Sequence, residues 1–127
     1  MKAVPFFAVS NIEESLRFYA EGLGFATKNQ WIDKGKLRWC WLERDGAAVM
    51  LQEIPGATGS QPAGITIYFI CDDALAIYRE LRAKGIDAAR PFVGNAMWVT
   101  SVQDPDGYRL FFESATDAPQ ESEYAEP

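Results

Sequence analysis

The chain has 127 residues, of which 48% are hydrophobic and 13% aromatic, a composition typical of one compact folded domain. Its net charge of −6 excludes the basic surface that a nucleic-acid-binding protein needs. No apolar run approaches the ~20 residues required to cross a bilayer. Cys40 and Cys71 lie in apolar runs without the spacing of a metal or disulfide motif, which favours buried, reduced thiols. We therefore expect a cytoplasmic protein that binds neither nucleic acid nor membranes.

The first half of the chain has the pattern of a strand, a helix and three further strands. The helix is expected to begin at Asn11, which has capping-box spacing to Glu14, and to end at Gly24. Asp45-Gly46 predicts a tight hairpin turn because such turns need positive φ angles. The expected buried stripe of the helix consists of Ile12, Leu16, Tyr19 and Leu23. The expected strands are residues 4–9, 25–32, 37–43 and 47–53.

The second half repeats this order. Gly24 recurs as Gly85, and Asp45-Gly46 recurs as Asp106-Gly107, at an offset of 61 residues. Residues 55–64 have the composition of a linker, and the helix that follows is expected to be capped by Asp72 or Asp73. Residues 116–127 are expected to form an acidic flexible tail. The expected strands of this half are residues 65–71, 88–93, 97–103 and 108–114.

This repetition predicts an α+β fold made of two paired β-α-β-β-β modules, residues 3–54 and 64–115. One helix can cover only one face of a four-stranded sheet. We therefore expect the modules to form a curved mixed sheet whose other face is an open trough, which is a natural place for a ligand.

Three segments of the chain resemble the vicinal-oxygen-chelate superfamily, which includes glyoxalases, bleomycin-resistance proteins and extradiol dioxygenases. These segments are residues 11–19 (NIEESLRFY), 22–25 (GLGF) and 104–113 (DPDGYRLFFE). The resemblance implies that the metalloenzymes of this group bind a divalent metal through four side chains of the trough. The corresponding positions here are Val4, Leu51 (or Met50 if the register differs by one), Thr66 and Phe111.

None of these four positions carries a histidine or a carboxylate, and the chain contains no histidine. Transition-metal sites need such donors. We therefore expect no metal and no cofactor. The resemblance then points to the bleomycin-resistance branch, whose members bind a flat, cationic drug without chemistry as homodimers that share their ligand grooves.

Trp39 and Trp41 are two residues apart on an expected strand, so both point to one face. If Cys40 and Leu42 pack under the helix, the tryptophans line the trough and can stack on a planar ligand. The alternative is that the tryptophans are core or dimer-interface residues.

Glu113 and Glu53 are candidates for anchoring a cationic group, although Glu113 could instead pair with Arg109. Thr66 and Tyr68 could supply hydroxyl hydrogen bonds. The complete set of expected ligand-binding residues is Phe6, Trp39, Trp41, Leu51, Glu53, Thr66, Tyr68, Trp98, Arg109, Phe111 and Glu113.

The function expected from the sequence is that of a metal-free small-molecule binding protein. It would act as a homodimer and sequester a planar, preferably cationic ligand. The chain has no nucleophile motif and no phosphate-binding loop. The alternative is an enzyme of the same superfamily, of the isomerase, lyase or dioxygenase type. Such an enzyme would either work without a metal through Glu53 or Glu113, or use atypical metal ligands.

Overall fold

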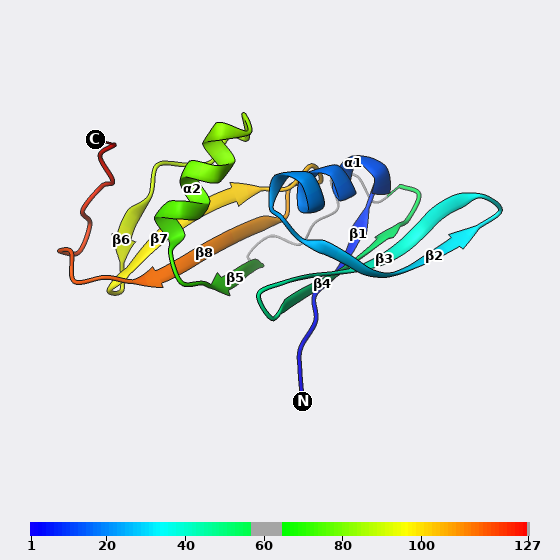
Figure 1. The fold of residues 1–127 in the computed structure, drawn as a ribbon, viewed down its shortest axis with the longest axis horizontal. Coiled ribbons are helices and arrows are strands. Elements are labelled where there is room, and N and C mark those ends of the chain that lie inside the picture. Colours follow the sequence, from blue (N-terminus) through cyan, green and yellow to red (C-terminus); the bar gives the residue numbers. More distant parts are fainter. Residues whose placement is uncertain (57–64, 127) are drawn as a thin grey trace. The chain divides into compact units, whose positions relative to one another are not determined.

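The computed structural model describes residues 1–56 and 65–126, and the chain forms two compact units (Figure 1). Unit 1 comprises Met1–Ala63 together with the turn Asp104–Gly107, and unit 2 comprises Gly64–Gln103 and Tyr108–Pro127. The expected modules were residues 3–54 and 64–115, and in the structure the turn at residues 104–107 belongs to unit 1. Most of the expected linker, residues 57–64, lies outside the described residues.

Unit 1 contains a four-stranded mixed sheet in the order β1-β4-β3-β2, in which only β1 and β4 are parallel. Helix α1 packs on β3 and β4. The elements of unit 1 are β1 (Phe6–Val9), α1 (Ile12–Leu16), the π-helix η1 (Arg17–Gly22), β2 (Ala26–Asp33), β3 (Lys36–Arg44) and β4 (Ala47–Glu53).

The first helix begins where the sequence predicts. The side chain of Asn11 accepts a hydrogen bond of 3.1 Å from the backbone N–H of Glu14, which satisfies one free donor of the first turn. From Arg17 onward the helix widens, and the N–H of Leu23 donates to the carbonyl of Phe18, five residues back, as in a π-helix. Gly24 then ends the helix with a φ of +75°.

Asp45 and Gly46 form the predicted tight hairpin between β3 and β4. Their φ angles are +47° and +85°, as a two-residue turn with right-handed strand twist requires. The turn sets the register of the two strands, so that Trp41 lies opposite Met50. This pairing decides which face each residue of β4 occupies.

Unit 2 repeats the arrangement, with the strand order β5-β8-β7-β6 and α2 packed on β7 and β8 (Figure 1). Asp73, the second of the two expected caps, accepts hydrogen bonds from the N–H groups of Leu75 and Ala76. Gly85 ends α2 with a φ of +76°, close to that of Gly24. The elements of unit 2 are β5 (Thr66–Ile70), α2 (Ala74–Ala83), β6 (Phe92–Gly94), β7 (Met97–Gln103) and β8 (Arg109–Ala115).

The two four-stranded mixed sheets and their few helices confirm the predicted α+β class. Strand β6 is shorter than expected and begins at Phe92 rather than at residue 88. Among the described residues, no helix is long and apolar enough to cross a membrane.

The chain after β8 was expected to be flexible, but the structure docks it on unit 2. The N–H of Val93 donates to the carbonyl of Ser122, and the N–H of Tyr124 donates to that of Pro91, each at 2.9 Å. The ring of Tyr124 lies edge-on to the rings of Tyr78 and Trp98. Phe92 and Glu123 form an isolated antiparallel bridge, so residues 121–124 lie along the edge of β6.

The turn Asp104–Gly107 was read as a hairpin turn, and the structure gives its carboxylates a further role inside unit 1. The buried hydroxyl of Tyr19 donates a 2.8 Å hydrogen bond to Oδ2 of Asp104. Asp106 accepts a hydrogen bond from the N–H of Ser10, directly before the helix cap. Both carboxylates thus bind the first helix of unit 1, and neither is available for a ligand.

We expect Tyr19→Phe to lower the free energy of unfolding by about 1–3 kcal/mol, because the change removes a buried hydrogen bond to a carboxylate. Urea unfolding followed by circular dichroism measures this effect. Tyr68→Phe is the matched control, since Tyr68 is exposed and the substitution should change stability little. Equal stability of the two variants would contradict this role for Asp104.

Candidate functional site

The sheet of unit 1 has one face under α1 and one open face. The face under the helix carries apolar side chains that are all buried, namely Phe7, Val9, Cys40, Leu42, Val49 and Leu51. The tryptophans Trp39 and Trp41 were expected on the open face only if Cys40 and Leu42 pack under the helix. Both Cys40 and Leu42 are buried. Burial also raises the pKa of the Cys40 thiol to about 11, with the Leu51 backbone acting in the opposite direction.

The open face of unit 1 is aromatic. Trp41 lies opposite Met50, which in turn lies opposite Phe6 of β1. Trp39 lies opposite Trp31 of β2. Trp31 and Phe6 are 51% and 47% exposed, which is high for such large apolar side chains. Together, Phe6, Trp31, Trp39, Trp41 and Met50 form a surface that we call the tryptophan face.

Two members of this open face, Trp31 and Glu43, were not among the expected ligand-binding residues, and Met50 was named only as the alternative to Leu51 at a metal position. Trp31 and Met50 share the face through their strand partners Trp39 and Trp41. Glu43, two residues past Trp41, brings a half-buried carboxylate to the same face. The face of Glu43 could have been predicted from the alternation of side chains along β3, and that of Met50 from the register of the Asp45-Gly46 hairpin.

Two expected ligand residues of β4 occupy the other face. Leu51 is 0% exposed and lies opposite Cys40 in the core under the helix. Glu53 shares the face of Val9, its partner on β1. Both placements follow from the hairpin register, which puts Met50 rather than Leu51 on the tryptophan face.

Glu53 holds α1 in place. Its Oε2 accepts a 3.1 Å hydrogen bond from the N–H of Ile12, the first residue of the helix. Its Oε1 lies 2.7 Å from Nζ of Lys36, and the two side chains are 13% and 50% exposed, respectively. The hydrogen bond from Lys36 and then that from Ile12 lower the pKa of Glu53 below its ordinary value of 4.5. Glu53 is therefore a structural carboxylate.

Unit 2 brings five expected site residues to the open face of its own sheet. Strand pairing places Thr66 opposite Arg109, Tyr68 opposite Phe111, and Ile70 opposite Glu113. The rings of Tyr68 and Phe111 are 5.1 Å apart in an edge-on contact. Within residues 1–56 and 65–126, no ion pair joins Glu113 to Arg109. Glu113 is thus a carboxylate beside an aromatic pair.

Trp98 lies on the opposite face from these residues. It is paired with Ser114, whose hydroxyl accepts a hydrogen bond from the N–H of Ala74 at the start of α2. The ring of Trp98 contacts Tyr124, with 6.2 Å between centroids. Trp98 therefore packs on the helix side of unit 2, and its expected place in the ligand platform is corrected.

The residues at the metal positions of the superfamily do not fit a metal. Val4, Met50 and Phe111 offer no nitrogen or carboxylate donor, and a threonine hydroxyl such as that of Thr66 is a poor ligand by itself. In the described part of the chain, no group of three Cys, Asp or Glu side chains could hold a metal ion. We therefore derive no chemistry through a metal.

Comparison with known proteins identifies the family. Residues 4–112 match the model of the Glyoxalase/Bleomycin resistance protein/Dioxygenase superfamily. The chain belongs to this superfamily, as its sequence resemblance predicts. A search of curated proteins found no match.

Solved structures with the same fold include TnmS3, an antibiotic binding protein from Streptomyces sp. CB03234. It is 22% identical, with a TM-score of 0.69 over 91% of this chain and 98% of that protein. TioX from Micromonospora sp. ML1 is 17% identical, with a TM-score of 0.71 over 94% and 100% of the two chains. A glyoxalase/bleomycin resistance protein from Streptomyces sp. CB03234 is 22% identical, with a TM-score of 0.68 over 88% and 98%. At these identities the likeness establishes the fold.

We expect Glu53→Gln to destabilise the protein by about 1 kcal/mol at pH 7, because the helix start and Lys36 both lose a negative charge. The folded-state pKa of Glu53 is lowered, so its contribution is complete above 4.5 and is lost as the pH falls through the folded-state value. The difference between wild type and variant should therefore shrink below about pH 4. Chemical unfolding at pH 7 and pH 3 measures it, with Asp87→Asn controlling for the loss of one negative charge. A difference that grows in acid would contradict this assignment.

Proposed function

We propose that this protein binds and sequesters a planar, preferably cationic small molecule without changing it chemically. The observation that carries the proposal is the tryptophan face. Trp31, Trp39 and Trp41 lie on one uncovered side of a single sheet, beside Met50 and Phe6. Aromatic rings offer a flat ligand a large contact area, and their negative faces attract cations.

The arrangement of charge supports the preference for a cation. Glu43 adjoins Trp41 on the open face of unit 1, and Glu113 adjoins Phe111 on the open face of unit 2. Neither carboxylate is in an ion pair among the described residues. The acidic groups that are committed to the fold, Glu53, Asp104 and Asp106, are distinct from these two. Each open face therefore keeps one negative charge for a ligand.

The residues at the metal positions of the superfamily favour sequestration over metal-dependent catalysis. The superfamily includes resistance proteins and enzymes, and the described residues place no nitrogen or carboxylate donor set at the metal positions. TnmS3, which shares the fold, is described as an antibiotic binding protein. Metal analysis and a turnover screen would distinguish the alternative, an enzyme of the same superfamily.

Proflavine, a planar aromatic cation, is a suitable probe, and acridine is its near-neutral analogue at pH 8. We expect Trp39→Ala to weaken proflavine binding by roughly 1–3 kcal/mol, because the ligand loses a stacking partner. Glu43→Gln should weaken proflavine binding more than acridine binding, because only the charge changes. Isothermal titration calorimetry measures both effects.

Trp98→Phe is the matched control for this experiment. It removes an indole from the helix side of unit 2, so it should leave proflavine affinity unchanged. Equal affinity of wild type and Trp39→Ala, with the fold intact, would refute the tryptophan face as the binding surface.

We further propose that the protein is a homodimer. Strand β2 is an edge of the unit 1 sheet, and its residues from Ala26 to Ile32 are all exposed. Trp31 and Ile32 are 51% and 54% exposed on this edge. Exposed apolar edge strands favour pairing with another chain. A second copy on β2 would also bring its aromatic residues close to the tryptophan face.

We expect wild type to sediment as a dimer at micromolar concentration and Ile32→Lys to shift it toward monomer, because a charge on the edge strand opposes pairing. Sedimentation equilibrium measures this. Thr27→Lys adds the same charge at the beginning of β2, away from the apolar pair, and serves as the control. A monomeric wild-type protein would rule out the dimer while leaving ligand binding by one chain open to the proflavine test.

A further inference from the structure

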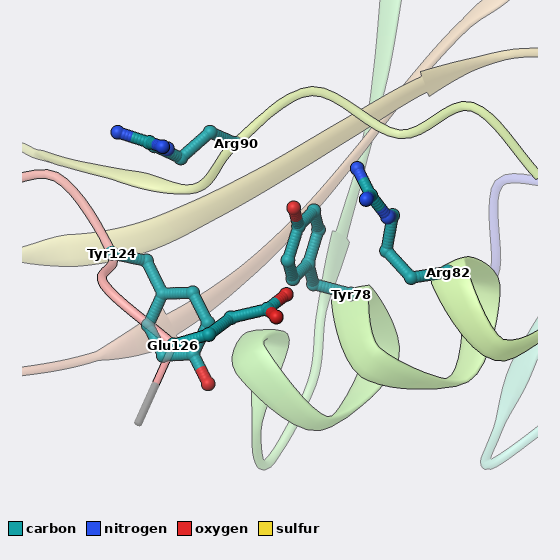
Figure 2. Close-up of a pocket in the computed structure, with 5 residues that line it drawn as sticks. All are labelled: Tyr78, Arg82, Arg90, Tyr124 and Glu126. Carbon is teal, nitrogen blue, oxygen red and sulfur yellow. The ribbon is translucent and has the colours of Figure 1, made fainter.

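Unit 2 contains a pocket on the helix side of its sheet, separate from the open face described above. Its volume is about 300 Å³, at the small end of the range for ligand sites. Tyr78 and Arg82 of α2 form one side, and Arg90, in the segment before β6, contributes a second arginine (Figure 2). Tyr124 and Glu126 of the docked C-terminal segment complete the lining. No residue of this pocket belongs to the proposed function.

The aromatic walls of the pocket are fixed by contacts within unit 2. The rings of Tyr78 and Tyr124 are 5.8 Å apart in an edge-on arrangement. The hydroxyl oxygen of Tyr124 accepts a 3.3 Å hydrogen bond from Arg79, and its backbone N–H donates to Pro91. The pocket is therefore defined by the same contacts that hold residues 116–126 on the sheet.

Two arginines, Arg82 and Arg90, line the pocket, although the whole chain carries a net charge of −6. The guanidinium carbon of Arg82 lies 5.7 Å from the ring centroid of Tyr78. Within the described residues, Arg82 has no ion-pair partner. Arg90 lies 3.2 Å from Glu123, but both side chains are well exposed, and pairs of this kind contribute little. Among the described residues, Arg82 therefore forms no ion pair with a carboxylate, and Arg90 forms only an exposed, weak one.

The remaining lining residue, Glu126, supplies the one carboxylate of the pocket. Figure 2 shows its side chain pointing from the end of the chain toward Tyr78. Among the described residues, no ion pair joins this carboxylate to Arg82 or Arg90. A bound anion would be repelled by the negative charge of Glu126.

We propose that this pocket binds a small aromatic carboxylate. The ring packs against Tyr78 and Tyr124, and the carboxylate pairs with Arg82, whose planar guanidinium matches a carboxylate in two hydrogen bonds. Arg90 adds a second positive charge, and Glu126 competes for the same position. The ligand differs in charge from the cation proposed for the tryptophan face, so the two sites can be tested independently.

Benzoate is the probe, with benzamide as the neutral analogue of the same shape and inorganic phosphate as an anion without a ring. In titration calorimetry on the full chain, we expect benzoate to bind at least about tenfold more tightly than either control, since only benzoate uses both the arginine and the rings. Equal binding of benzamide would overturn the anionic character of the site. Equal binding of phosphate would overturn its aromatic character.

The variants locate the site. Arg82→Gln should lower the affinity for benzoate by about tenfold or more. The control Arg17→Gln removes an exposed arginine from unit 1 and should leave this affinity unchanged. Glu126→Gln should raise the affinity for benzoate by roughly threefold, because the substitution removes a negative charge that repels the benzoate anion. Arg82 is exposed, so its substitution should not unfold the protein. Unchanged affinity in Arg82→Gln, or weaker binding in Glu126→Gln, would overturn the proposal.

A spectroscopic signature separates this pocket from the tryptophan face. In a ¹H–¹⁵N correlation spectrum, with indole signals assigned from Trp98→Phe and Trp39→Phe, benzoate should shift the indole N–H of Trp98, whose ring contacts Tyr124. It should leave the signal of Trp39 in place. The reverse pattern would show that benzoate occupies the open face and would refute the pocket as its site.

Discussion

Within residues 1–56 and 65–126, each sheet has one helical segment packed on one of its faces, and this constraint governs the rest of the structure. Side chains alternate between the faces of a strand, so a covered face and an uncovered face arise together. In unit 1 the covered face is filled by Cys40, Leu42 and Leu51. Trp39 and Trp41 must then lie on the uncovered face, where they increase the apolar surface in contact with water. Such a surface is stabilised by a ligand or a second chain, and both proposals for this face follow from that fact.

How much of this arrangement can be predicted from the sequence depends on the turns. The two-residue turn at Asp45-Gly46 sets the register of its hairpin. Alternation along β3 puts Trp39 and Trp41 on one face and Cys40 and Leu42 on the other, but it left open which face the helix covers. Counting from the same turn to a superfamily position left a one-residue ambiguity between Leu51 and Met50. Side chains alternate along a strand, so an error of one residue in the register moves a side chain from the core face to the open face. Trp98 was grouped with Trp39 and Trp41 without an argument from register, and its pairing with Ser114 places it on the helix side of its own sheet.

The roles of the carboxylates could not be predicted, because they depend on partners far away in the chain. Glu53 binds the helix start 41 residues before it, and Asp104 binds Tyr19 across 85 residues. Local patterns identify a cap such as Asn11, which acts within its own turn, but they contain no information about such distant pairs. The same applies to residues 116–126, whose acidic composition suggested a flexible tail. Tyr124 holds them through contacts with Tyr78 and Trp98.

Several carboxylates are bound to partners within the fold, so the net negative charge of the protein does not by itself predict which ligands it prefers. A net charge of −6 suggests a general preference for cations, but the charge that a ligand meets is local, because exposed charges more than ~8–10 Å apart are largely screened at physiological ionic strength. In unit 2, Glu113 lies on the open face of the sheet and Arg82 on its helix side. The two sides can therefore select ligands of opposite charge. The charge that each side presents follows from the element that carries the side chain, β8 for Glu113 and α2 for Arg82, and the net charge of the chain does not determine it.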